Sequence, residues 1–345
     1  DRRTRRPWEE GTAAVVFSCT KGVMAIAAYQ LVQGGRLDLD AAVASYWPEF
    51  GQHGKASTTV RMVLSHRAGL PVLDEPLTRA EALSWAPVIR AIERQRPLWV
   101  PGTAHTYHAK TYGWLIGEVI RRITGQTPGS FVAERLATPL ALETWIGLPV
   151  TQRDRVARSE PPPSPTGPGP DWSEAAREIH ERAVTLNGIF PFPDRDGEVT
   201  FNDPEIRAAE LPGGNGISTA RSLARLYGAC VRAVDGVRLL SDESIRDALV
   251  ERSRGPQLFG SPIGGFRWGT GFQLDAPPWC PMLGPTSFGH DGAGGQLAFA
   301  DAEAGTGFAY VTNQMGGPGD HRSQRLVAAL RQSLDSLGEG RSTGG

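Results

Sequence analysis

The sequence predicts an α/β (α+β) fold, in which an antiparallel sheet is flanked by helices and accompanied by a mostly helical domain. Three apolar runs separated by glycines, 266–274, 296–301 and 307–313, have the composition of antiparallel strands. Several longer segments instead repeat apolar residues every three to four positions, which is typical of helices. Because both patterns occur in one chain, we expect a mixed fold.

Six segments are predicted to be helices: 22–33, 58–66, 78–96, 111–124, a stretch from Thr219, and 320–336. The first is Ala-rich and mostly apolar, and it stops at Gly34-Gly35, as buried helices often do. The third begins with Thr78 and Glu81 at the spacing of a capping box, and it ends before Pro97.

A proline-rich stretch interrupts this pattern. Residues 159–170 read Ser-Glu-Pro-Pro-Pro-Ser-Pro-Thr-Gly-Pro-Gly-Pro, a composition that packs into neither a helix nor a sheet. The surroundings up to about Asn202 are expected to be irregular as well. We therefore predict a long surface flap that can border a substrate cleft.

Composition argues against several classes of function. The formal net charge is −1, so no overall field attracts nucleic acid or an anionic membrane. No apolar run approaches the roughly 20 residues of a membrane span. The three cysteines, Cys19, Cys230 and Cys280, lack Cys-x-x-Cys spacing, which argues against a disulfide framework or structural zinc. We expect free thiols, a cytoplasmic location and no cofactor, and the sequence leaves the oligomeric state open.

The most informative motif is Ser18-Cys19-Thr20-Lys21, because the chain has only three lysines and one lies three residues after a serine. On a helix these two positions share a face. Desolvation lowers the pKa of an ammonium, and the resulting amine can accept the proton of a serine. The structural alternative is that Ser18 caps the helix while Lys21 extends its stem from the core to water.

Two further polar clusters suit the same cleft. Tyr107, His108 and Ala109 end a loop just before the predicted helix 111–124. Residues 288–295, Phe-Gly-His-Asp-Gly-Ala-Gly-Gly, precede an apolar strand, and such glycines allow backbone N–H groups to approach an oxyanion. The structural alternative for the first cluster is that Tyr107 only packs, with its hydroxyl in a hydrogen bond. For the second cluster it is a plain hairpin turn. Histidine spacing does not support a metal site.

In this order the three stretches resemble the serine β-lactamase and penicillin-binding-protein superfamily, in its class C β-lactamase-like branch with the family VIII carboxylesterases. The matching motifs are Ser-x-x-Lys at 18–21, Tyr-x-Asn at 107–109, and Lys-Thr-Gly or its variants at 290–292. Similar supporting stretches at 64–71, 112–118 and 213–220 extend the resemblance over most of residues 8–335.

The resemblance implies a β-lactamase/transpeptidase-like fold and an acyl-transfer site. It makes Ser18 the nucleophile, Lys21 its proton partner and Tyr107 the base, with the backbone N–H groups of Ser18 and Ala293 as the oxyanion hole. The residues expected to contact substrate are His108, Ala109, His290 and Gly292. A nearby ammonium is expected to lower the pKa of the Tyr107 phenol, so that the two groups titrate as a unit.

The sequence departs from the family pattern at three places, of which the first two bear on substrate choice. Ala109 replaces an asparagine, and its methyl group cannot donate to an amide substrate. His290 replaces a lysine, and histidine is mostly neutral at pH 7. Only seventeen residues precede Ser18, where the family usually has a helix and two strands, so we expect that a natural N-terminal segment is missing.

We predict that residues 1–50 and 205–345 form the α/β domain, that 51–204 form the helical domain with its flap, and that the site lies between them. The expected function is hydrolysis of carboxylic esters, as a serine carboxylesterase acting through an acyl-enzyme on Ser18. One alternative is an acyltransferase; a second, weakened by the departures at positions 109 and 290, is a β-lactamase or D-amino-acid peptidase. A catalytically silent scaffold is the non-enzyme alternative. The expected partner is a small-molecule ester or acyl substrate.

Overall fold

The computed structural model describes residues 5–162, 172–191, 197–260, 265–317 and 320–342. Its strands are β1 (Ala14–Phe17), β2 (Thr144–Trp145), β3 (Gly216–Ser218), β4 (Arg267–Trp268), β5 (Gln273–Leu274), β6 (Ser287–Gly292), β7 (Gln296–Asp301) and β8 (Thr306–Tyr310). Its α-helices are α1 (Cys19–Gln33), α2 (Val60–Leu64), α3 (Arg79–Ala82), α4 (Trp85–Arg94), α5 (Thr111–Thr124), α6 (Pro128–Val132), α7 (Glu174–Thr185), α8 (Pro204–Ala208), α9 (Ala220–Val231), α10 (Asp242–Ala248) and α11 (Arg322–Ser342).

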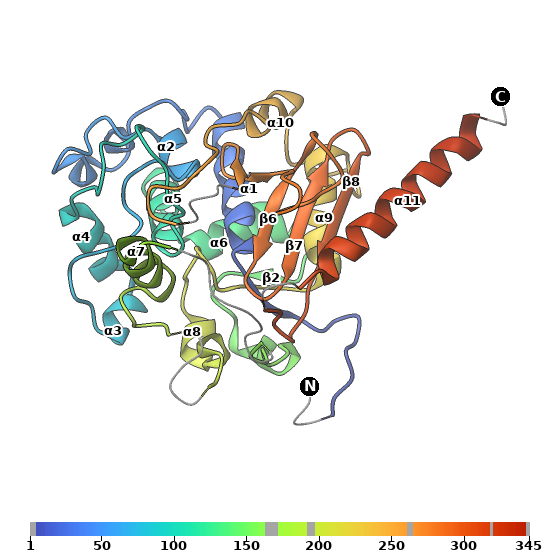
Figure 1. Ribbon diagram of the computed structural model, residues 1–345, viewed down its shortest axis with the longest axis horizontal. Coiled ribbons are helices and arrows are strands. Elements are labelled where there is room, and N and C mark those ends of the chain that lie inside the picture. The colour runs from blue at the N-terminus through green and yellow to red at the C-terminus, as the bar shows by residue number, and fades with distance from the viewer. Residues whose placement is uncertain (1–4, 163–171, 192–196, 261–264, 318–319, 343–345) are drawn as a thin grey trace.

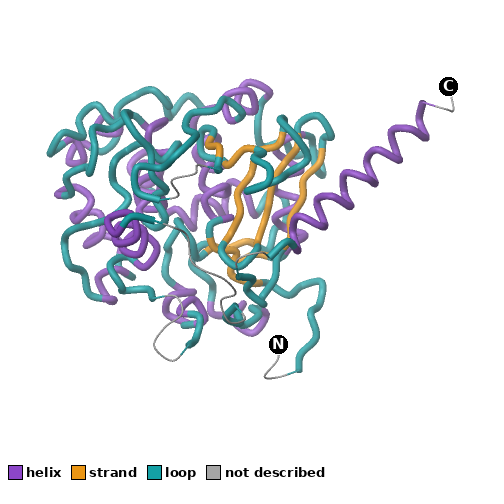
Figure 2. The backbone as a smooth tube through the Cα atoms, in the orientation of Figure 1, coloured by secondary structure: helices purple, strands orange, loops and turns teal. Residues whose placement is uncertain are grey.

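Five antiparallel strands form the larger sheet, in the order β4-β5-β6-β7-β8 (Figures 1 and 2). The predicted antiparallel sheet flanked by helices is thus confirmed. The predicted run 266–274 is not one strand, because the chain turns at Gly271, whose φ is +86°, and pairs β4 with β5. Strand β6 was not predicted, since its glycines lower the strand signal, yet it pairs with β7 along its whole length.

The larger sheet is covered on both faces. Along β7 the side chains of Ala298 and Ala300 belong to the main core, while Leu297 and Phe299 join a smaller cluster with Val327 of α11. This alternation is the ordinary consequence of a strand's period of two. Helices α1 and α9 pack on the first face, and α11 crosses the second before it extends away from the body (Figure 1).

A smaller antiparallel sheet, in the order β1-β3-β2, leads the chain to the serine motif. Strand β1 ends at Phe17, whose φ of +45° is uncommon for a residue other than glycine. The turn sends the chain directly into α1. Strand β2 lies within the segment 51–204 and pairs with β3, which lies outside it. The division of the chain into two domains stays a prediction.

Proline explains one difference from the predicted helices. The segment 78–96 has the predicted capping box of Thr78 and Glu81, but it forms two helices, α3 and α4. Pro87 is the third residue of α4, where the missing N–H costs nothing, whereas in one continuous helix its ring would clash with the carbonyl of Leu83. The predicted helices 111–124 and from Thr219 are confirmed as α5 and α9.

The proline-rich flap is described only in part, because residues 163–171 lie outside the described ranges. The expectation that the following residues are irregular is wrong, since α7 spans Glu174–Thr185. The hydroxyl of Ser173 caps this helix by accepting from the N–H of Ala176, and its Ala, Glu and Arg residues are good helix formers.

The three cysteines are free and buried in the structure. Within the described residues, none of the helices combines the length and the apolar character needed to cross a bilayer.

Candidate active site

Ser18 stands at the N-terminus of α1, directly after the tight turn at Phe17. Its side chain makes no capping hydrogen bond with the helix. Instead, its Oγ accepts hydrogen bonds from the Tyr107 hydroxyl at 2.7 Å and from Lys21 Nζ at 3.1 Å. The capping alternative for this serine is therefore wrong, and two proton-carrying groups converge on one oxygen.

Lys21 is completely buried one turn along α1, so it does not extend to water. Besides Ser18 Oγ, its Nζ donates to the carbonyl oxygens of Ala109 at 2.8 Å and Gly213 at 2.5 Å. These three acceptors match the three donors of an ammonium. Burial first, and then the charge of Lys110, lowers the pKa of Lys21 well below its usual value. The neutral amine is consequently accessible as a proton acceptor.

Aromatic side chains hold the ring of Tyr107. Trp268 stacks on it with ring centroids 5.4 Å apart and an interplanar angle of 17°, and His66 contacts it edge-on at 4.9 Å. Lys21 Nζ lies 4.8 Å from the ring centroid. Burial nevertheless raises the pKa of Tyr107 well above its usual value, so the expectation of a lowered pKa is wrong. In the resting site the phenol is protonated and donates to Ser18.

The glycine-rich turn between β6 and β7 lies against the end of β1. A Cβ built at Gly292 would lie 2.4 Å from the carbonyl oxygen of Val16, so only glycine allows this approach. The next residue, Ala293, lines the same cavity as Ser18. Gly294 and Gly295 have φ values of +84° and +100°, so the hairpin turn itself requires those two glycines.

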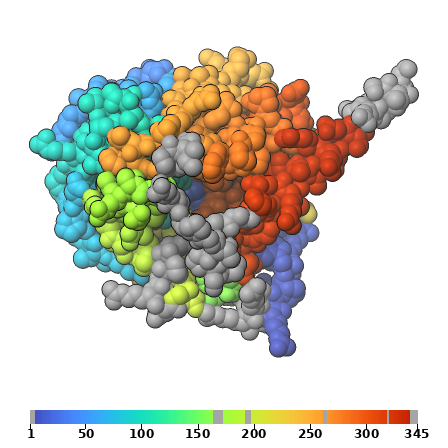
Figure 3. All heavy atoms as spheres, in the orientation of Figure 1, coloured from blue at the N-terminus to red at the C-terminus, as the bar shows by residue number. Residues whose placement is uncertain are grey.

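Ser18 opens into a cavity of about 790 Å³. Figure 3 shows a hollow near the centre of this face, between yellow-green α7 and the orange sheet. Aromatic rings from several elements line the cavity, and the charged side chains on its wall come from separate elements. The aromatic lining residues are Phe17, Tyr107, Trp172, Phe201, Phe266 and Trp268, and the ionisable ones beside them are Lys110, His180, Glu181 and Asp291.

Of the four residues predicted to contact substrate, only one lines the cavity in the structure. Ala109 lines the cavity, whereas His108 is completely buried behind it. His108 Nε2 accepts from the N–H of Leu70 at 3.0 Å, and its Nδ1 donates to the carbonyl of Thr106 at 2.6 Å. Burial lowers the pKa of His108 to about 4, in keeping with a neutral ring. This histidine supports the loop of Tyr107.

His290 and Gly292 lie in β6 and not in the expected loop, and neither of them lines the cavity of Ser18. The imidazole of His290 is 1% exposed, and its Nδ1 donates to the carbonyl of Asp291 at 2.7 Å. Burial lowers the pKa of His290, so the ring supplies no positive charge near pH 7. Its ring lies beside both Tyr107 and Trp268, with centroids 6.2 and 5.6 Å away, and its backbone pairs with Ala298 of β7.

Lys110 and Trp268 are two of the cavity residues that were not identified from the sequence. Lys110 is one of the three lysines, and that rarity was the available signal. Trp268 lies in an apolar run that predicted only a strand, so nothing distinguished it from a core residue. Among the described residues, no group of three or more His, Cys, Asp or Glu side chains is arranged to hold a metal ion.

Comparison with known proteins places this chain in a family. The sequence model of the Beta-lactamase family matches residues 1–333. The Esterase/beta-lactamase LipL of Mycobacterium tuberculosis is 32% identical over 338 residues, which cover 92% of this chain and 73% of that relative.

Solved structures give the same result. A penicillin-binding protein homologue from Caulobacter crescentus has a TM-score of 0.83 and 37% identity, covering 95% of this chain and 85% of that one. A family VIII carboxylesterase has a TM-score of 0.83 and 33% identity, with the same coverage. These matches confirm the predicted resemblance and the β-lactamase/transpeptidase-like fold. The chain belongs to the beta-lactamase family.

Proposed function

We propose that this protein is a serine hydrolase that cleaves carboxylic esters through a covalent acyl-enzyme on Ser18. The observation that carries the proposal is the convergence of Lys21 Nζ and Tyr107 Oη on Ser18 Oγ, with the lysine fully buried. The names of the relatives, an esterase/beta-lactamase and a family VIII carboxylesterase, support the same reaction.

Acylation begins from the neutral amine of Lys21, which accepts the proton of Ser18 as Oγ bonds to the ester carbonyl carbon. The N–H groups of Ser18 and Ala293 donate to the oxygen that becomes negative. When the ester C–O bond breaks, the Tyr107 hydroxyl gives its proton to the leaving alkoxide and regains one from the Lys21 ammonium. Hydrolysis reverses the roles: water loses its proton to this pair, bonds to the acyl carbon, and releases the acid from Ser18.

The wall of the site favours esters over β-lactams and peptides. Ala109 presents a methyl group, which cannot hydrogen-bond to the amide of an acylamino side chain. His290 is neutral and buried, and its Nδ1 is already bonded to Asp291, so it offers no charge for a carboxylate at that position. The aromatic lining suits an apolar acyl chain. It would also suit an alcohol acceptor in place of water, which is the acyltransferase alternative.

A panel of p-nitrophenyl esters from acetate to octanoate, assayed beside nitrocefin, tests the proposal. We expect turnover of the esters, a kcat/KM for nitrocefin at least about tenfold lower because charge-assisted contacts are missing, and no turnover by Ser18→Ala. Circular dichroism of the variant checks its fold. Adding a primary alcohol and measuring the transfer product separates an acyltransferase from a hydrolase. A nitrocefin rate equal to the best ester rate would contradict the proposed preference.

A further inference from the structure

The three lysines of the chain have very different surroundings. Lys21 Nζ has three oxygen acceptors, and Lys55 Nζ donates to the carbonyl oxygens of Glu93 at 2.9 Å and Gln95 at 2.6 Å. Within the described ranges, Lys110 Nζ makes neither a hydrogen bond nor an ion pair. Its Nζ instead lies 4.4 Å from the centroid of the Phe201 ring.

Lys110 lies in the wall of the cavity that contains Ser18. It immediately precedes α5, and its Nζ would be 3.7 Å from a Cβ built at Gly214, which also lines the cavity. Burial lowers the pKa of Lys110 to about 8. An ammonium carries three donors, and leaving them without acceptors in a partly desolvated wall costs free energy. A ligand oxygen at this position would remove that cost.

The other charges of the cavity leave this part of the wall cationic. Asp291 accepts from the side-chain amide of Gln273 at 2.9 Å and is held on β6. Glu181 belongs to α7 and makes no ion pair with Lys110 in the described structure. The cavity wall beside Lys110 is aromatic and includes Phe201 and Phe17, whose rings pack edge-on with centroids 5.4 Å apart. An apolar chain that ends in an anion matches this surface.

We propose that Lys110 is a specificity-determining residue that binds a carboxylate on the acyl part of the substrate. The preferred substrates are then half-esters of dicarboxylic acids, in which Ser18 attacks the ester end while the free carboxylate pairs with Lys110. The inference rests on the proposed ester hydrolysis and adds the class of acyl group. Ammonium–carboxylate hydrogen bonds are among the stronger ones in proteins, so the selectivity should be measurable.

The test compares two esters with five-carbon acyl chains, mono-p-nitrophenyl glutarate and p-nitrophenyl pentanoate. We expect the native chain to prefer the glutarate in kcat/KM, and Lys110→Met to lower the glutarate-to-pentanoate ratio by about tenfold to a hundredfold. Lys110→Arg should keep most of the preference. Using the ratio removes any effect of Lys110 on the pKa of Lys21, because that effect acts on both esters.

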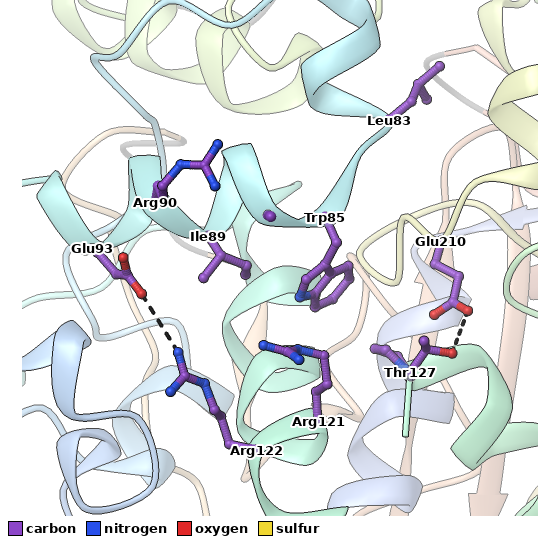
Figure 4. Close-up of a pocket in the computed structure, with 11 residues that line it drawn as sticks. Leu83, Trp85, Ile89, Arg90, Glu93, Arg121, Arg122, Thr127 and Glu210 are labelled. Atoms are coloured by element: carbon purple, nitrogen blue, oxygen red, sulfur yellow. Dashed lines mark hydrogen bonds and ion pairs between the residues drawn. The ribbon is translucent and has the colours of Figure 1, made fainter. Parts of the chain in front are cut away.

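Arg90→Met is the matched control. Arg90 is exposed in a separate cavity of about 600 Å³ between α4 and α5, which shares no lining residue with the cavity of Ser18 (Figure 4). The substitution removes one positive charge from the surface and should leave the glutarate-to-pentanoate ratio unchanged. Equal changes in both variants would mean that the ratio reports overall charge, which would overturn the proposal.

A binding measurement keeps the inference independent of turnover. Calorimetric titration of monomethyl glutarate into Ser18→Ala should give a Kd at least about tenfold lower than for the same variant carrying Lys110→Met. Equal Kd values, or equal loss of activity on both esters, would overturn the assignment of Lys110 to the carboxylate. If the native chain hydrolyses neither ester, the proposed function fails, and the titration still decides whether Lys110 binds the carboxylate.

Discussion

At the residue scale, the proposed chemistry depends on Ser18 Oγ. It accepts from a phenol and from a buried lysine, and the same lysine is fixed by the carbonyl oxygens of Ala109 and Gly213. Because burial raises the pKa of Tyr107 and lowers that of Lys21, the protons of the pair favour the phenol over the amine. Lys21 is therefore the first proton acceptor in our account, and Tyr107 the donor to the leaving group.

Removing either group should be nearly as damaging as removing both. We expect Lys21→Met and Tyr107→Phe each to lower kcat/KM for a p-nitrophenyl ester by about 10²-fold or more, because each interrupts one proton path. The double variant should be little worse than the poorer single variant. Steady-state kinetics of the three variants provide the measurement, and multiplicative losses would show that the residues act separately.

The pH dependence follows from the direction of the Lys21 shift. Its amine must be neutral to accept the proton, so kcat/KM should fall as pH drops through its lowered pKa, well below the usual value of about 10.4. A pH profile of ester hydrolysis by the free enzyme measures this limb. In Lys110→Met the limb should move to higher pH, because loss of the neighbouring charge raises the pKa of Lys21. An unchanged limb would argue against Lys21 as the acceptor.

Sequence spacing was sufficient for part of the site and insufficient for the rest. Ser18 and Lys21 lie on one helix face, so their proximity could be read from the chain. The direction in which the pKa of Tyr107 shifts could not be predicted from the sequence, because it depends on how deeply Trp268 and its neighbours bury the phenol. The position of Lys110 in the cavity was also not predicted, since a lysine beside a helix N-terminus is exposed in most proteins.

At the scale of elements, a buried carboxylate joins α4 to α5. Glu118 has no exposed surface, and its oxygens accept from Trp85 Nε1, Arg121 Nε and Arg122 Nε, each at 2.7 Å. Burial alone would raise the pKa of Glu118, but these hydrogen bonds lower it below its usual value. The α5 helix that follows Tyr107 is thereby held against its neighbour.

Glu118→Gln should lower the free energy of unfolding by about 2–4 kcal/mol at pH 7, because one of the charged partners of a buried network is lost. Since the folded-state pKa is lowered, this contribution is present above the unfolded pKa of about 4.3 and disappears as pH falls through the folded value. Urea unfolding of both chains at pH 7 and pH 3 measures it. Glu303→Gln, at an exposed position, is the control and should change the free energy of unfolding little. A change as small as this in Glu118→Gln would contradict the account.

Local rules predicted elements where local forces decide them. Periodicity and a glycine end were enough for α5, and the capping box was enough for the start of α3. Strand β6 was missed because its stability comes from pairing with β7, which is a contact between segments and not a property of either. The helix α7 was overlooked because the prolines before it dominated the composition of that stretch.

At the scale of the whole molecule, four separated segments meet at Ser18. The loop of Tyr107, the segment at Gly213, and the turn at Ala293 converge on the start of α1. Close backbone packing holds the segment at Gly213 against α5, since a Cβ at Gly113 of α5 would lie 2.0 Å from the backbone nitrogen of Gly213. Motif order indicated that the segments share a site, but their distances depend on such long-range packing.

Gly113→Ala should therefore disturb the site from within the core. We expect a loss of stability of about 1–3 kcal/mol from overpacking, together with a lower kcat, because the displaced Gly213 carbonyl no longer fixes Lys21. Gly284→Ala is the matched control, since a Cβ there meets no atom within 4 Å. Thermal unfolding and ester kinetics of both variants give the result. If Gly113→Ala is destabilised but keeps full activity, this packing does not affect catalysis and the prediction is wrong.

If Ser18 carries the acyl group during turnover, intact-protein mass spectrometry should detect the acyl-enzyme. Rapid acid quenching of the enzyme with excess p-nitrophenyl pentanoate should reveal a mass increase of one pentanoyl group, which peptide mapping should locate on Ser18. The adduct should be absent from Ser18→Ala and should persist longer in Tyr107→Phe, in which hydrolysis is slowed. Ester turnover with the label on another residue, or unchanged labelling of Ser18→Ala, would contradict the account.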